Sequence, residues 1–298
     1  MNQSNYQYLI ASLPELTLPD LYSPPGEMQD YRRLGYLFSE IMENLSEKDH
    51  ALARYIFYSI DNRNLVNLLF HPDEPFVPHG YYNQAELDYE SKALDAIPEY
   101  MKLFLELVER GEPEVPNLRI EDHLYDYFYR ETSSLQSPFL REWYSFERDL
   151  HNILSAIECR KHNVPIEHRK TIRIGQELAQ AIIGDNEISH AIVESRSYDF
   201  SLSGTLPLVE RVLTWDSSNP IVYKREIVQL KWEVLGELSA GEIFSLESVL
   251  AYLARLQLLI RWSSLDEASG RENADRILRK LLKQGIALSG LESDRGAA

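Results

Sequence analysis

Apolar side chains recur at steps of three and four residues along most of this chain, which is the pattern of amphipathic helices. One such face is formed by Leu34, Leu37, Phe38, Ile41 and Leu45. The same spacing predicts further helices over residues 46–69, 83–110, 118–132, 137–163, 166–184, 221–238, 245–262 and 267–286. No run of alternating β-branched residues ends at an Asn-Gly or Asp-Gly turn, so strands are not expected. The sequence therefore predicts an all-α fold.

Capping residues and prolines mark the limits of these helices. Ser46 precedes an acidic residue by three positions, and Ser137 directly precedes a proline, so both are candidate N-caps. Pro98 should kink or split the helix that contains it. Prolines cluster in residues 72–78, which favours an extended connection. Residues 197–219 are the least helical region and are predicted to be a linker or a short hairpin of helices.

The chain is strongly acidic, with 30 basic and 47 acidic residues and a formal net charge of −17. Most of this charge lies in residues 1–132, which carry 10 basic and 24 acidic side chains. A negative surface repels phosphate backbones and anionic membrane faces, so nucleic-acid binding and direct membrane adsorption are disfavoured. The asymmetry suits steering toward a basic partner, or it is simply a solvated acidic surface.

Cysteine content and hydropathy favour a cytoplasmic location. Cys159 is the only cysteine, so no disulfide forms within the chain. The first basic residue is Arg32, so the basic region of a secretory signal is absent. The best apolar run, residues 249–262, is interrupted by Arg255 and Arg261 and falls short of the roughly 18 residues of a membrane span. We therefore expect a cytoplasmic chain that does not cross a membrane.

Two predicted helices carry the same pair of polar residues. Asp61 and Asn64 stand three positions apart in the helix 46–69, and Asp149 and Asn152 have the same spacing in the helix 137–163. An aromatic residue precedes each pair, and an apolar residue follows its asparagine directly. Residues three apart share one helix face, and buried polar groups need partners. We interpret the four residues as structural, bonding a neighbouring helix end or loop backbone.

Sequence motifs for catalysis and cofactor binding are absent. The chain has no phosphate-binding glycine loop, no dinucleotide motif and no Gly-x-Ser-x-Gly elbow. Cys159, His162 and His168 lie near one another, but a single cysteine makes a weak zinc site. Glu187 and His190 form one Glu-x-x-His motif, whereas di-iron bundles use two. We therefore expect no enzymatic activity, no metal and no cofactor.

One positive stripe stands out on this acidic chain. It comprises Arg160, Lys161, Arg169 and Lys170, with Arg173 close by. Such a cluster contacts an acidic partner or balances nearby carboxylates, and the sequence leaves both interpretations open. These residues are our candidates for a partner contact.

The helix 137–163 resembles a helix of the C subunits of A/V-type rotary ATPases, whose counterpart in the eukaryotic vacuolar enzyme is called d. The pattern Tyr-x-x-Glu-x-Asp-x-x-Asn-Ile of that family is matched by Tyr144, Glu147, Asp149, Asn152 and Ile153. Residues 8–14 and 246–266 are similar to a poorly characterised bacterial family that accompanies such ATPases.

This resemblance implies a non-catalytic central-stalk subunit. The C subunits are funnels of three related helical lobes on the cytoplasmic mouth of the membrane rotor ring. They receive the foot of the central shaft and so couple ATP turnover to proton or sodium transport. The implied partners are other V/A-type ATPase subunits, namely shaft and ring. The chain would then lie peripherally on the inner face of the cell membrane, through protein contacts only.

Mapped onto this sequence, the resemblance gives two or three related lobes with short proline-rich connections. We expect an acidic N-terminal lobe over 1–116, a central lobe over 117–218, a C-terminal lobe over 219–290 and a disordered tail over 291–298. The Asp-x-x-Asn pairs would mark equivalent helices of two lobes. The C-terminal lobe has no third pair and offers only residues 252–261 in a comparable place.

Two alternatives remain from the sequence. The acidic first half and the 18 tyrosines also suit a helical scaffold that binds an unrelated cytoplasmic partner. A metal-dependent helical enzyme would use Glu187, His190 and nearby acids. Within the leading interpretation, the chain either replaces the C subunit or binds beside it.

Overall fold

A computed structural model describes residues 3–18, 31–115, 117–168, 170, 172–174, 177–179, 181–216, 218–241 and 243–264. The helices of this part are α1 (Gln3–Ser12), a 3-10 helix (Tyr31–Leu34), α2 (Tyr36–Glu43), α3 (Glu47–Phe70), α4 (Gln84–Ala93), α5 (Glu99–Arg110), α6 (Ile120–Ser133), α7 (Pro138–Lys161), α8 (Glu187–Glu194), α9 (Pro207–Leu213), α10 (Pro220–Leu238) and α11 (Leu246–Ser263). Two short strands, β1 (Ile172–Ile174) and β2 (Glu177–Ala179), complete it. The all-α prediction is confirmed. The helix predicted over 267–286 and the tail over 291–298 lie outside the described residues.

Three long helices begin after a capping serine. The side chains of Ser46, Ser137 and Ser245 accept backbone N–H groups at the starts of α3, α7 and α11. Each bond satisfies one of the free N–H groups of a first helical turn. The N-caps predicted at Ser46 and Ser137 are confirmed, as is the break at Pro98, which separates α4 from α5.

The helix predicted over residues 166–184 is wrong. This segment contains the antiparallel hairpin of β1 and β2, in which Ile172 pairs with Ala179 and Ile174 with Glu177. Ile172 and Ile174 alternate with Arg173, and β-branched side chains favour the extended backbone over the helix. The alternation is too short to be recognised by periodicity alone.

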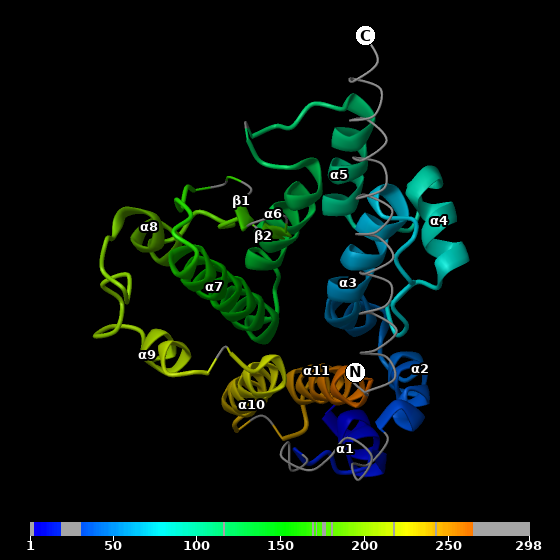
Figure 1. The fold of residues 1–298 in the computed structure, drawn as a ribbon. Coiled ribbons are helices and arrows are strands. Elements are labelled where there is room, and N and C mark those ends of the chain that lie inside the picture. Colours follow the sequence, from blue (N-terminus) through cyan, green and yellow to red (C-terminus); the bar gives the residue numbers. More distant parts are fainter. Residues whose placement is uncertain are drawn as a thin grey trace.

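Five helices form a closed ring, in which each contacts the next. Helix α3 contacts α6, α6 contacts α7, α7 contacts α10, α10 contacts α11, and α11 returns to α3. Figure 1 shows these helices arranged around the centre of the molecule, with α4 and α8 lying on opposite outer sides. The ring brings residues that are far apart in the sequence to one central space.

Two main hydrophobic clusters hold the ring. The larger one joins buried residues from Tyr6 to Tyr144 with others from Leu235 to Ile260, so the two ends of the described chain share a core. The second lies between Leu150 and Leu230. The division between the clusters falls inside α7, because the first half of this helix contributes to one cluster and the second half to the other.

Tyrosine and phenylalanine rings fill the space between α3, α5, α6 and α7. Tyr58 contacts Tyr100, Tyr100 contacts Phe128, and Phe128 contacts Tyr144, each pair nearly edge-to-face. Such ring pairs add about 0.5–1.5 kcal/mol beyond their buried area. Several of the tyrosines therefore pack between the helices of the ring.

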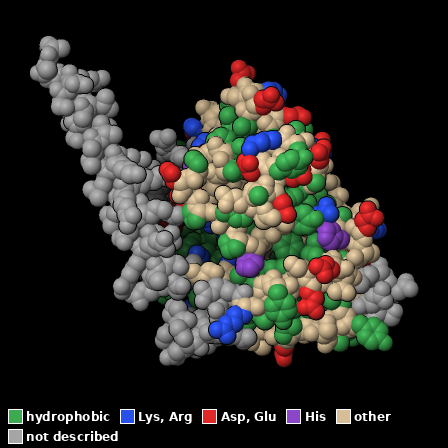
Figure 2. All heavy atoms as spheres, turned by 90° about the vertical axis from the view of Figure 1, so that its right-hand side faces the viewer, with side chains coloured by type: hydrophobic (Ala, Val, Ile, Leu, Met, Phe, Trp, Pro, Cys, Tyr) green, Lys and Arg blue, Asp and Glu red, His purple; other side chains and the backbone are tan. Residues whose placement is uncertain are grey.

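The molecular surface mixes residue types. On the face shown in Figure 2, charged side chains are dispersed among hydrophobic ones. Within the described residues, no helix is both long and apolar enough to span a membrane.

Candidate functional site

Each asparagine of the two polar pairs holds a loop against its helix. On α3, Asn64 Nδ2 donates to Val77 O (2.9 Å), and Val77 N donates to Asn64 Oδ1 (2.8 Å). On α7, Asn152 makes the same two bonds with Ile183, at 2.8 and 2.9 Å. Both asparagines are buried, and each amide satisfies the N–H and the C=O of one loop residue. The two asparagines thus have the same bonding pattern as well as the same place in their pairs.

The aspartates of the pairs are held differently. Asp61 is fully buried and accepts backbone N–H groups from Tyr81 (2.9 Å) and Tyr82 (3.3 Å). No cation of the described residues pairs with it. Burial outweighs the two hydrogen bonds and raises the pKa of the Asp61 carboxyl from 3.8 to about 7.

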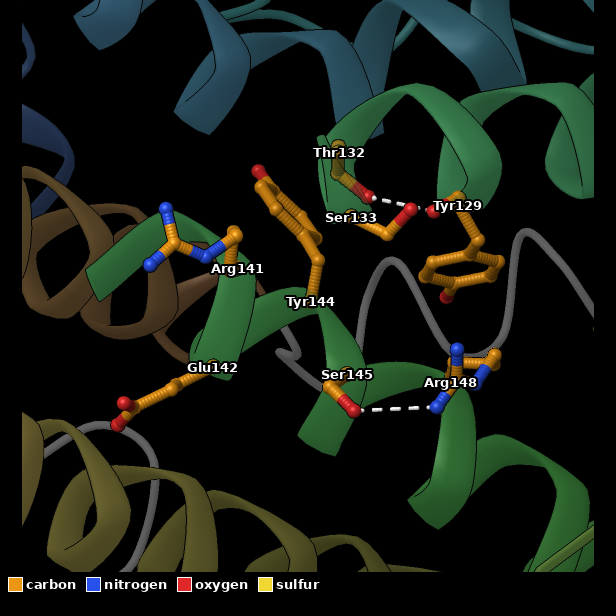
Figure 3. A pocket seen from close by; sticks show the side chains of 8 residues that line it. All are labelled: Tyr129, Thr132, Ser133, Arg141, Glu142, Tyr144, Ser145 and Arg148. Carbon is orange, nitrogen blue, oxygen red and sulfur yellow. Dashed lines mark hydrogen bonds between the residues drawn. The ribbon is translucent and has the colours of Figure 1, made fainter. Parts of the chain in front are cut away.

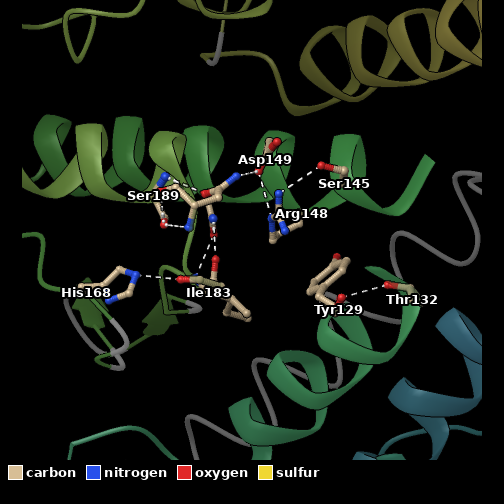
Figure 4. A network of polar contacts seen from close by, with 11 residues as sticks. Tyr129, Thr132, Ser145, Arg148, Asp149, His168, Ile183 and Ser189 are labelled. Carbon is tan, nitrogen blue, oxygen red and sulfur yellow. Dashed lines mark hydrogen bonds and ion pairs between the residues drawn. The ribbon is translucent and has the colours of Figure 1, made fainter. Parts of the chain in front are cut away.

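Asp149, in contrast, has a charged partner. Its Oδ1 accepts from Arg148 Nε (3.0 Å) and from Asn186 Nδ2 (2.9 Å). Figure 4 shows this network on α7, with Arg148 also donating to Ser145 and the bonded Ile183 beneath the helix. The second loop is therefore fixed at two points, by Asn152 and through Asn186.

Both bonded loops lead into a helix with an asparagine cap. Asn83 and Glu86 form a capping box at the start of α4, and Asn186 and Ser189 form one at the start of α8. A long helix, a loop bonded by its asparagine and a second, asparagine-capped helix therefore occur twice in the chain.

The long helices α7 and α11 each bond the backbone of α3. The Tyr144 hydroxyl donates to Tyr55 O, and Gln257 Nε2 donates to Ile56 O at 3.2 Å. Counted from the capping serine of its own helix, Gln257 has the same position as Asp149, since 257 − 245 and 149 − 137 are both 12. The C-terminal region thus has a buried polar residue where α7 has its aspartate.

A hollow of about 300 Å³ opens between α3, α10, α11 and the loop after α3. Four cations line it, Arg63, Lys224, Lys231 and Arg261, together with His79, and the lining contains no Asp or Glu. Lys231 Nζ is paired with Glu147 Oε2 of α7 at 2.7 Å. Among the described residues, no carboxylate forms an ion pair with the other three cations. The acidic chain therefore has a basic hollow between α3, α10 and α11.

The positive charges of this hollow repel one another. The pKa of the Lys224 ammonium is lowered first by burial and then by the charges of Arg261 and Arg63. The side chains of Lys224, Arg63 and Arg261 are nevertheless open to the hollow, which leaves them accessible to an incoming group. Like charges held together, with no carboxylate among the lining residues, are a feature of anion-binding sites.

A second hollow, of about 290 Å³, lies between α6 and α7 (Figure 3). Two of its hydroxyls bond helix backbone, since Thr132 donates to Tyr129 O and Ser133 to Arg130 O, while Ser145 Oγ accepts from Arg148. Arg141 likewise donates to Leu135 O at 2.6 Å. No hydroxyl in this hollow is paired with a general base, so the arrangement does not provide an activated nucleophile.

The predicted contact cluster is largely engaged within the chain. Arg160 Nη2 donates to Ser195 O (2.8 Å), and its guanidinium stacks on a phenylalanine ring at 3.9 Å. Lys161 and Lys170 form ion pairs with Glu158 and Glu167, at 2.7 and 2.6 Å. Arg169 lies outside the described residues. Both lysines remain partly exposed at the surface.

Two of the candidate metal ligands are neighbours, since the rings of His168 and His190 stack with centroids 5.2 Å apart. Their nitrogens have other partners, because His168 Nε2 donates to Gly184 O (2.7 Å) and His190 contacts Asp185 at 2.5 Å, while Cys159 is buried. Nowhere in the described part of the chain do three or more His, Cys, Asp or Glu side chains gather as a metal site would require.

The cations of the central hollow were missed as a site in the sequence. Arg63, Lys224 and Arg261 belong to three helices that are distant along the chain. One signal was present, because Arg261 interrupts an otherwise apolar helix. Arg261 is exposed at the hollow, and its position beside Arg63 and Lys224 follows from the packing of α11 against α3 and α10.

The loop bond made by Asn152 gives a first testable prediction. Asn152→Ala should lower the free energy of unfolding by about 3 kcal/mol, because it leaves the buried N–H and C=O of Ile183 without partners. Asn152→Leu keeps the side-chain volume and removes only the hydrogen bonds, so its free energy of unfolding should fall by a similar amount. Urea unfolding followed by circular dichroism measures both. Wild-type stability of Asn152→Leu would show that the bonds contribute nothing.

The fold and this geometry define an all-α protein in which one helix–loop–helix arrangement occurs twice, with a basic hollow between α3, α10 and α11. The chain belongs to the family described as "Protein of unknown function (DUF2764)", whose model matches residues 1–286. No curated protein and no solved structure matches the chain.

Proposed function

We propose that the chain is a non-catalytic central-stalk subunit of a bacterial V/A-type ATPase, similar to the C subunits of such enzymes. In this role it links the rotor shaft to the membrane ion-carrying ring, and so couples ATP turnover to proton or sodium transport. The observation that carries the proposal is the bonding pattern shared by α3 and α7, because related lobes would repeat such a helix–loop arrangement.

The repeated helix–loop–helix arrangement supports the same proposal. The C subunits consist of related helical lobes, and α3 and α7 each bond a returning loop through an equivalent asparagine. The residues that match the pattern of those subunits lie on α7, where Asn152 bonds Ile183, Asp149 accepts from Asn186, and Tyr144 donates to Tyr55 of α3. Three of the resembling residues thus hold α7 to its own loop and to α3.

A stalk protein of this kind would associate with the membrane only through its contacts with the rotor ring. This agrees with a net charge of −17, which disfavours direct adsorption to anionic lipid. We propose a peripheral location on the inner face of the cell membrane, as part of the complex. The partners would be the central shaft and the membrane ring.

Purification of the intact ATPase tests this proposal. We expect an enzyme isolated through a tag on its shaft to contain this chain in an amount equal to the shaft. Chemical cross-linking with mass spectrometry should then join the chain to both the shaft and the ring. An intact, active enzyme that lacks the chain would overturn the proposal. Recovery of the tagged chain with unrelated proteins only would favour the scaffold interpretation.

Charge reversal tests the candidate contact cluster in the same preparation. Lys170→Glu changes a lysine that is paired with Glu167, and Lys92→Glu on α4 changes one paired with Asp88, so the second is a matched control. Loss of the chain from the enzyme in the first variant alone would assign the contact to this cluster. Equal retention of both variants would exclude it.

A further inference from the structure

The central basic hollow has the properties of a ligand site that neither the family nor the stalk proposal assigns. Its volume of about 300 Å³ is at the lower end of the range for small-molecule sites, roughly 300–1,000 Å³. Its cations come from α3, α10 and α11, and they converge on one space. The rest of the chain is strongly acidic, so the charge of the hollow is opposite to its surroundings.

We propose that this hollow binds a compact phosphate-bearing anion. Arg63, Lys224 and Arg261 are open to the hollow, and no carboxylate of the described residues forms an ion pair with them. Glu147 is paired with Lys231 and its charge also acts on Arg261, so this one carboxylate faces four cations and the cluster keeps a net positive charge for a ligand. The proposal does not depend on the stalk function, and either can fail without the other.

The donor set favours phosphate over a single carboxylate. Arginine presents parallel N–H donors that match the oxygens of phosphate in pairs, while lysine contributes a point charge. A phosphate monoester carries up to two negative charges and three acceptor oxygens on one centre, so it can engage cations from several helices at once. A monocarboxylate would leave at least one of the three cations unpaired.

The remaining walls favour a ligand with an organic body. Phe38, Val77, Pro78 and Trp262 line the hollow beside the cations. Small-molecule sites combine mostly apolar walls with a few convergent polar groups, and this lining has that composition. The ligand class is therefore a small phosphorylated molecule whose apolar part contacts these side chains.

Titration calorimetry on the full chain at low ionic strength tests the proposal, with inorganic phosphate, pyrophosphate, ATP and citrate as probes. We expect saturable binding of pyrophosphate or ATP that weakens as salt is added. Arg261→Gln and Lys224→Gln should each weaken it about tenfold to a hundredfold, as expected for loss of a charged hydrogen bond. Lys92→Gln, which removes one positive charge from α4, should leave the affinity unchanged.

Thermal unfolding without ligand separates binding from folding. Lys224→Gln relieves repulsion from Arg261 and Arg63, so its melting temperature should equal or exceed that of the wild type. Sedimentation with phosphatidylcholine vesicles, with or without phosphatidylglycerol, distinguishes a lipid headgroup from a soluble phosphate. Binding to the anionic vesicles that requires Arg261 would assign the phosphate to lipid. Absence of saturable binding to every probe, tighter binding of citrate than of pyrophosphate, or an equal loss in Lys92→Gln would overturn the proposal.

Discussion

Gly80→Ala is expected to lower the free energy of unfolding by about 4 kcal/mol, a large effect for the addition of one methyl group. A Cβ at Gly80 would lie 2.2 Å from Asp61 Oδ1 and 3.0 Å from Asp61 Cγ. Asp61 is fully buried on α3 against this loop, so its carboxyl cannot turn out into solvent. The methyl group would therefore displace the carboxyl and break its bonds to Tyr81 and Tyr82.

Gly204→Ala is the matched control for this substitution. A Cβ at Gly204 meets no atom within 4 Å, and its backbone does not adopt the left-handed conformation. Gly204→Ala should leave the free energy of unfolding unchanged or raise it by up to about 1 kcal/mol, since alanine restricts the unfolded chain. Urea titration of both variants gives the comparison. Equal stability of the two would show that the loop after α3 is not held by Asp61.

The two Asp-x-x-Asn pairs were predicted in part from the sequence. Their spacing and flanking residues indicated two equivalent helices, and the cost of burying an amide indicated that they bond backbone. The partners, Val77 and Ile183, could not be predicted, because one lies 13 residues and the other 31 residues away along the chain. The sequence of a loop does not indicate which buried asparagine will form hydrogen bonds with its backbone.

The basic hollow and the β1–β2 hairpin were not predicted from the sequence, for two different reasons. The hollow depends on the closure of a ring, so Arg63 and Arg261 become neighbours only through long-range packing. The hairpin β1–β2 has strands of three residues, which is too short for a period of two to be distinguished from a helical pattern. Local periodicity identifies long helices, whereas sites between helices arise from their arrangement.

The buried carboxyl of Asp61 should make stability fall as pH rises from about 4 to about 7. The pKa of this group is raised from 3.8 to about 7 in the folded chain, so the folded state holds a proton that the unfolded state releases in this window. Stability decreases with pH wherever the folded state binds more protons. At about 1.4 kcal/mol per pKa unit, the decrease is at most about 4 kcal/mol and ends near pH 7.

Asp61→Asn isolates this contribution from the other titrating groups of the chain. Its amide oxygen still accepts one N–H from Tyr81 or Tyr82, as the protonated acid does, but it does not titrate. Urea unfolding of both proteins at several pH values should show the wild type losing stability relative to Asp61→Asn between pH 4 and 7. Parallel curves would mean that Asp61 is ionised in the folded chain throughout this range. The two backbone hydrogen bonds would then outweigh the burial, and the loop after α3 would be held by a charged group rather than a neutral one.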